Sequence, residues 1–152
     1  MVSPGEGADC MHNQKDELIL RLETLWAGTG NRGVGFAAGK LPVERYERAI
    51  VLDLEVRVAL GIAVVLFTGE EPEKPVQRLM CSERQIVFGE VGSGIAGMNP
   101  SVLSVEVRPF EPGRCKAIVS GASKEGIVKQ HSAKKAVESI INILEGVARA
   151  EG

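Results

Sequence analysis

The stretch Ala49–Phe67 reads AIVLDLEVRVALGIAVVLF and contains the longest uninterrupted apolar run of the chain. Over residues 49–60, aliphatic side chains alternate with charged ones, which predicts a strand with one apolar and one solvent-facing side. Antiparallel sheets tolerate such a solvent-facing side, whereas parallel sheets are covered on both faces. After Gly61, the continuous run Ile62–Phe67 predicts a central strand that is covered on both faces.

The residues before this stretch predict a first strand, a glycine-rich turn and a short helix. From about Glu17 to Ala27, leucines at alternating positions predict the strand. The glycine-rich sequence GTGNRGVG follows at 28–35. Pro42 suits the first position of a short helix over LPVERYERA, because a helix start leaves that N–H group without an intrahelical partner anyway.

The residues after this stretch complete the predicted sheet and end in a helix. GEEPEKPV, with three acids and two prolines, predicts a surface loop, and further strands are expected near 77–80, 84–91, 102–108 and 115–119. A proline–glycine turn at 109–113 joins the last two strands as a hairpin. From about Lys124 onward the apolar positions follow a helical period, with one stripe formed by Ala133, Ala136, Val137, Ile140, Ile141, Leu144 and Val147.

These patterns together predict an α+β fold. The expected architecture is a mainly antiparallel twisted sheet of about six strands, with one short helix after the first strand. A long C-terminal amphipathic helix packs on the sheet, because nothing else in the chain could cover its apolar stripe. We expect residues 1–16 to form a flexible N-terminal tail and residues 17–150 to form a single domain.

Composition excludes several classes of protein. The net charge of −2 and the aromatic content of 4% make a nucleic-acid partner unexpected, because both basic patches and stacking platforms need more. No apolar run is long enough to span a bilayer. The three cysteines, Cys10, Cys81 and Cys115, are an odd number without regular spacing. This favours a reducing compartment, so a cytoplasmic location is expected.

The loop predicted between the last strand and the C-terminal helix is the candidate binding site. Residues 120–129, SGASKEGIVK, offer backbone N–H groups and lysines near a helix N-terminus, where an anion is favoured. We therefore predict a small binding or regulatory domain, in a homo-oligomer, that holds a phosphate- or carboxylate-bearing ligand at this loop. The expected contacts are Ser120, Gly121, Ser123, Lys124 and Lys129. The alternative interpretation is that Ser123 is only a helix cap and the lysines form a solvated face.

Known cofactor and metal motifs do not fit. Both G-x-G-x-x-G matches, at 28–33 and 92–97, lack the strand–turn–helix context that a dinucleotide site requires. No C-x-x-C or H-x-x-x-H spacing is present, so no metal site is predicted and no cofactor is identified.

Two other functions stay open. The protein could be an enzyme without a standard motif that uses His131, Cys81 or both, since a thiol needs a neighbouring base to act as a nucleophile. It could also be a structural assembly protein without a ligand, in which the apolar run Ile62–Phe67 is covered by another chain.

Overall fold

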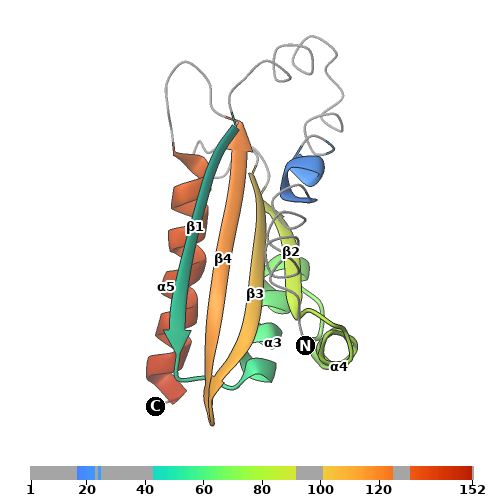
Figure 1. Ribbon diagram of the computed structural model, residues 1–152, viewed down its shortest axis with the longest axis vertical. Helices are drawn as coiled ribbons and strands as arrows, with labels where there is room; N and C mark the ends of the chain where they lie inside the picture. The colour runs from blue at the N-terminus through green and yellow to red at the C-terminus, as the bar shows by residue number, and fades with distance from the viewer. Residues whose placement is uncertain (1–16, 23, 25–42, 92–100, 125–130, 152) are drawn as a thin grey trace, which may run out of the picture.

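The computed structural model describes residues 17–22, 24, 43–91, 101–124 and 131–151. They contain a four-stranded antiparallel sheet in the order β1-β4-β3-β2. The strands are β1 (Val43–Leu52), β2 (Ile86–Val91), β3 (Ser101–Glu111) and β4 (Arg114–Lys124). The labelled helices are α3 (Val56–Thr68) and α4 (Glu73–Met80), which connect β1 to β2, and α5 (Ser132–Glu151), which follows β4 (Figure 1). The predicted α+β class, with an antiparallel sheet and a C-terminal helix, is confirmed.

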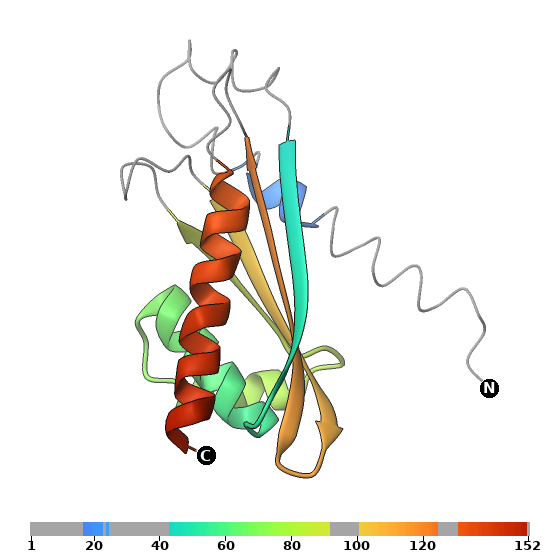
Figure 2. The same cartoon turned by 90° about the vertical axis from the view of Figure 1, so that its left-hand side faces the viewer.

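The main core lies on one face of the sheet. Both α5 and α3 contact this face, α5 over β1, β4 and β3 and α3 mainly over β3 and β2 (Figure 2). The strands contribute buried side chains at alternating positions: Leu103, Val105 and Val107 from β3, and Cys115, Ala117 and Val119 from β4. The predicted stripe of α5 packs against them, with Ala133, Ala136, Val137, Ile140, Ile141 and Leu144 all buried. Packing of the helix on the sheet is therefore as predicted.

The β3–β4 hairpin also matches its prediction. The two strands run on to Glu111 and from Arg114, and Gly113 in the turn has φ 75°, a left-handed conformation that glycine adopts without strain. Across the sheet, β1 is joined to α5 by the Tyr46 hydroxyl, which donates to Glu138 Oε1 at 2.6 Å. This hydrogen bond lowers the pKa of the Glu138 carboxyl and raises that of the Tyr46 phenol.

The stretch 49–67 is where the prediction was wrong. The strand β1 ends at Leu52, and α3 begins at Val56, so the predicted central strand Ile62–Phe67 is helical. The inner residues of α3 are Ala59, Leu60, Ala63 and Val64. Their spacing is that of a helix face, but it lies inside a sequence that is apolar in almost every position, so alternation and helical period could not be separated. Gly69, with φ 67°, ends the helix by donating its N–H to the Val65 carbonyl.

Before that stretch, the predicted strand and the predicted short helix are both wrong, because each segment adopts the other kind of structure. Residues 17–22 and 24 are helical, not a strand, and residues 43–52, expected to begin as a short helix, form β1. Leu18 and Leu22 are four residues apart and pack on the face of the sheet opposite α5, against Val102 and Ala122. Leucine and glutamate are also good helix formers. In β1, the aromatic and β-branched side chains suit a pleated surface.

The predicted number of about six strands was too high, because several segments predicted as strands are helical. Residues 77–80, predicted as a strand, belong to α4, and α5 begins at Ser132, after β4 has continued to Lys124. The predicted tail 1–16 and the glycine-rich stretches 28–35 and 92–97 lie outside the described residues. None of the helices in the described part of the chain is long and apolar enough to cross a membrane.

Candidate functional site: an apolar groove between α3 and α4

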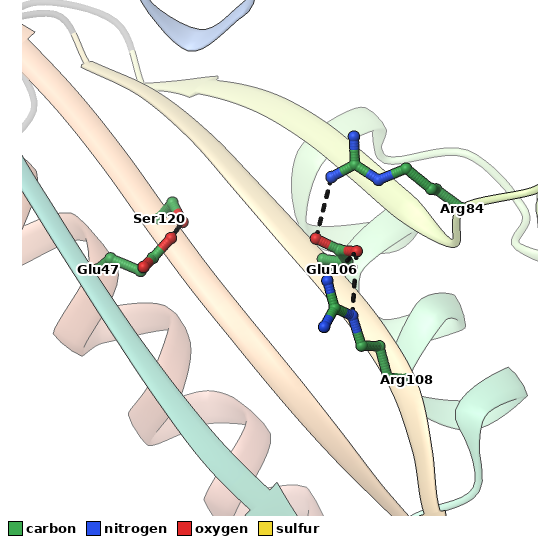
Figure 3. Close-up of polar contacts among 5 residues, drawn as sticks. All are labelled: Glu47, Arg84, Glu106, Arg108 and Ser120. Atoms are coloured by element: carbon green, nitrogen blue, oxygen red, sulfur yellow. Dashed lines mark hydrogen bonds and ion pairs between the residues drawn. The ribbon is translucent and has the colours of Figure 1, made fainter. Parts of the chain in front are cut away.

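The predicted anion site is strand rather than loop in its first half. Ser120, Gly121, Ser123 and Lys124 are among the last residues of β4, and Lys129 lies outside the described residues. The Ser120 hydroxyl donates to Glu47 Oε1 at 2.8 Å on the neighbouring strand (Figure 3). Lys124 is only 1% exposed. Both are held within the body of the protein.

Ser123 caps the helix α5 from the neighbouring strand β4. Its hydroxyl accepts a hydrogen bond at 3.2 Å from the backbone N–H of Ala133 in the first turn of α5. The first N–H groups of a helix have no intrahelical partner, so a side chain from β4 here satisfies one of them. Gly121 lies below the same turn, where a Cβ atom would come within 3.0 Å of its neighbours. Ser123 and Gly121 thus hold α5 against the sheet.

The candidate nucleophile and base are not brought together. Cys81 follows α4, whereas His131 precedes α5, and these two ends lie at opposite ends of the sheet (Figures 1 and 2). His131 has φ 54°, and its Nδ1 lies 3.3 Å from Glu44 Oε1. Cys115 is a buried residue of β4, and burial raises the pKa of its thiol to about 11. Within the described ranges, no group of His, Cys, Asp or Glu side chains could hold a metal ion.

A buried carboxylate on the second face of the sheet was missed by the sequence analysis. Glu106 is 4% exposed. Its Oε2 accepts a hydrogen bond from Arg84 Nη2 at 3.1 Å, and its Oε1 accepts two from Arg108 (Figure 3). The available signal was an acid between two valines of a predicted strand, with an arginine two residues later on the same face. Since both oxygens are engaged by guanidinium groups, this arrangement acts as an ion-pair network rather than as an acid–base centre.

A groove of about 650 Å³ lies between α3 and α4. Its apolar wall is formed by Val58, Gly61, Ile62, Val65, Leu66 and Val76. The α3 members recur at three- and four-residue spacing, so they form one side of the helix, next to the side that packs on the sheet. The helix α3 therefore has two apolar faces, one in the core and one along the groove.

The floor of the groove is set by a close approach of the two helices. Gly61 faces Pro72 and Val76, and a Cβ atom added to Gly61 would lie 3.6 Å from the Pro72 Cβ, which is ordinary contact distance. A larger side chain at this position would occupy the groove. The outer wall is unusually open for apolar side chains, because Val65 is 47% exposed and Leu66 is 40% exposed. Contiguous apolar surface of this kind marks binding sites more often than isolated exposed residues do.

Three charged side chains stand at the rim. Arg57 lies in the first turn of α3, Glu71 lies in the connection to α4, and Glu73 is the first residue of α4. In the part of the chain that the structure describes, no ion pair or side-chain hydrogen bond engages any of the three. The groove thus combines an apolar interior with a few uncommitted polar groups, which is the usual composition of a small-molecule site.

Comparison with known proteins does not assign this site. No model of a protein family matches the chain, and no curated protein matches it. Among solved structures, the crystal structure of Ara h 8.0201 aligns with a TM-score of 0.41 and 12% sequence identity, over 72% of this chain and 99% of that chain. A likeness of this degree supports no conclusion about function, so the function has to be argued from the residues of the groove.

Proposed function

We propose that this protein binds a small, largely apolar molecule in the groove between α3 and α4. The observation that carries the proposal is the second apolar face of α3, where Val65 and Leu66 keep 47% and 40% of their surface exposed. Apolar surface left in water costs about 25 cal/mol per Å², so a ligand that covers it is stabilised in proportion to the contact. The volume of about 650 Å³ lies within the range of known ligand pockets, which runs from about 300 to 1,000 Å³.

Binding of Nile red, a neutral fluorescent dye that responds to apolar surroundings, tests the proposal. Gly61→Leu should block the groove and abolish the rise in fluorescence, because the new side chain points at Pro72 and Val76. Leu66→Gln should weaken dye binding about fivefold, since covering the remaining 40% of a leucine side chain is worth about 1 kcal/mol.

The matched control is Ile143→Gln on α5. Ile143 is 41% exposed, almost the same as Leu66, but it does not line the groove. Equal effects of the two glutamine substitutions would refute a specific site in the groove, as would unchanged dye binding by Gly61→Leu. Circular dichroism and urea unfolding of each variant exclude loss of the fold as the cause.

The anionic ligand predicted for residues 120–129 is the second candidate. Its support is a lysine, Lys124, at the end of β4, next to Ser123, which caps the first turn of α5. Charge reversal at the buried Lys124 would disturb the fold, so Lys129→Glu is the better test. A calorimetric titration with inorganic phosphate that shows binding to the wild type and none to this variant would favour this candidate over the groove.

Assembly is the remaining alternative. If a second copy of the chain covers Val65 and Leu66 in a homo-oligomer, light scattering will show the oligomer and Leu66→Gln will shift it toward the monomer. Dye binding would then increase on dilution, because the dye and the second copy compete for the same surface. A monomer with concentration-independent dye binding would exclude this reading of the groove.

A further inference from the structure

We infer that two copies of this chain pair through the outer edge of β1, so that their sheets join into one continuous antiparallel sheet. The partner is a second copy, related to the first by a twofold axis that passes between the two Tyr46 residues. This contact uses a surface separate from the groove, so it does not depend on the proposed function.

The outer edge of β1 is long and regular. The strand stands at one end of the strand order, and the described strands pair with it only on its β4 side. Its ten residues include no proline, and its register with β4 has no bulge. The helix α5 packs on one face of β1, so it covers that face rather than the edge (Figure 2). Natural edge strands are usually short, interrupted or covered, because their free N–H and C=O groups can pair with another strand.

The charged residues of β1 form a self-complementary pattern. Residues 44–48 read ERYER. In an antiparallel twofold pair centred on Tyr46, Arg45 of each copy lies opposite Glu47 of the other. Glu44 of each copy lies opposite Arg48 of the other in the same way. Charges of a single sign along the edge would repel a second copy, whereas this mirrored order of the two signs attracts one.

The charges also select the register. Shifting the centre of the pair to Arg45 or Glu47 would place that residue directly against its own copy, and the same holds for Glu44 and Arg48. Like charges directly opposite each other destabilise a strand pair. A centre at Ala49 would place Glu47 and Arg48 opposite apolar side chains. Of these registers, only the one described above pairs every charge of the segment with its opposite.

The pair formed by Arg45 and Glu47 contributes most, because both side chains are exposed and available. Within the described ranges, Arg45 makes no ion pair or side-chain hydrogen bond. Glu47 accepts the Ser120 hydroxyl through Oε1 only, which leaves its second carboxylate oxygen for a guanidinium group (Figure 3). Glu44 and Arg48 already contact side chains of their own copy, so we expect a smaller contribution from them.

The test is sedimentation of the full chain and of two charge reversals, Arg45→Glu and Glu47→Arg, over a range of protein concentration. The wild type should form a dimer. Each variant alone places like charges opposite each other in both symmetry-related contacts, so its dimer dissociation constant should rise about tenfold or more. A mixture of the two variants has opposite charges in both contacts and should form a heterodimer about as tightly as the wild type. Recovery on mixing also shows that both variants are folded.

Two controls leave the edge of β1 intact. Arg149→Glu on α5 changes the net charge as Arg45→Glu does and should leave the dimer unchanged. Leu66→Gln in the groove should leave it unchanged as well. The inference is overturned if the wild type is a monomer at every concentration, if the reversals leave the dimer intact, or if the mixture is no more dimeric than either variant alone. A dimer weakened only by Leu66→Gln would be assembled through the groove and would overturn it too.

Discussion

Adding one methyl group at Gly121 should destabilise the protein, whereas the same change at Gly146 should stabilise it. A Cβ atom at Gly121 would lie 2.9 Å from Val137 Cγ2, 3.0 Å from Leu103 Cδ2 and 3.3 Å from the Ala133 carbonyl oxygen. The carbonyl belongs to the first turn of α5 and cannot rotate away as a flexible side chain could. At Gly146, in the interior of α5, a Cβ atom would meet nothing within 4 Å.

The magnitudes follow from these distances. Forcing a methyl group into a filled core costs about 1–3 kcal/mol, and the loss of chain entropy in the unfolded state returns about 0.4–1 kcal/mol. Gly121→Ala should therefore lower the free energy of unfolding by about 1–2 kcal/mol. Gly146→Ala should raise it by about 1 kcal/mol, the difference in helix propensity between the two residues.

Urea unfolding followed by circular dichroism measures both changes. With slopes of about 1–3 kcal/mol per molar urea, the midpoints should move by about half a molar unit in opposite directions. Adding Val137→Ala to Gly121→Ala should cost less than the sum of the two single changes, because it removes the nearest clashing atom. A Gly121→Ala protein as stable as the wild type, or strict additivity with Val137→Ala, would refute the close contact between β4 and α5.

Two further predictions concern titratable groups. Because the Tyr46 hydroxyl lowers the pKa of Glu138, the ionised carboxylate stabilises the fold above its ordinary pKa of about 4.3, and this contribution is lost as the pH falls through the lower folded-state value. The urea midpoint of the wild type should thus fall more steeply than that of Glu138→Gln between about pH 5 and pH 3, and parallel profiles would contradict the argument. In a Cys10→Ser background, an aromatic disulfide reagent should modify the exposed Cys81 in the native protein at neutral pH. Cys115, whose thiol has a pKa of about 11, should react only when urea unfolds the chain, and rapid native labelling of two thiols would show that the core is open.

The elements that could be predicted from sequence are those with one unambiguous period. The helix α5 has an apolar stripe and a charged opposite face, so only a helix explains it. The β3–β4 hairpin has a proline–glycine turn that marks its centre. The structure of residues 17–22 was harder to predict. Leucines at 18, 20 and 22 fit the alternation of a strand, whereas the pair at 18 and 22 fits the spacing of a helix face. Leu20 is 67% exposed, so only the pair four residues apart is used for packing.

The candidate site depended on contacts that a single sequence cannot show. Ser120, Ser123 and Lys124 were predicted to lie in a loop because the last strand was expected to span residues 115–119, but each is buried in β4. Their hydrogen-bond partners, such as Glu47 for Ser120, are distant in sequence and become neighbours only through the pairing of β1 with β4. The pairing of β1 with β4 determines these neighbours, and it joins two segments that lie far apart in the sequence.

The error at α3 and the proposed function have the same physical origin. A helix that only covers a sheet needs one apolar face, and its outer face is normally polar. The residues of α3 are apolar on both sides, so the segment resembled a doubly covered strand, which is also apolar throughout. In the structure the inner side is covered by the sheet, while the outer residues Val65 and Leu66 remain exposed along the groove. The exposed apolar side of α3 departs from the rule that the outer face of such a helix is polar. Departures of this kind are expected at functional sites. If Leu66→Gln and Val65→Thr proved to raise solubility without any loss of dye binding, the excess apolar surface would be a folding liability, and the argument for a site on α3 would fall.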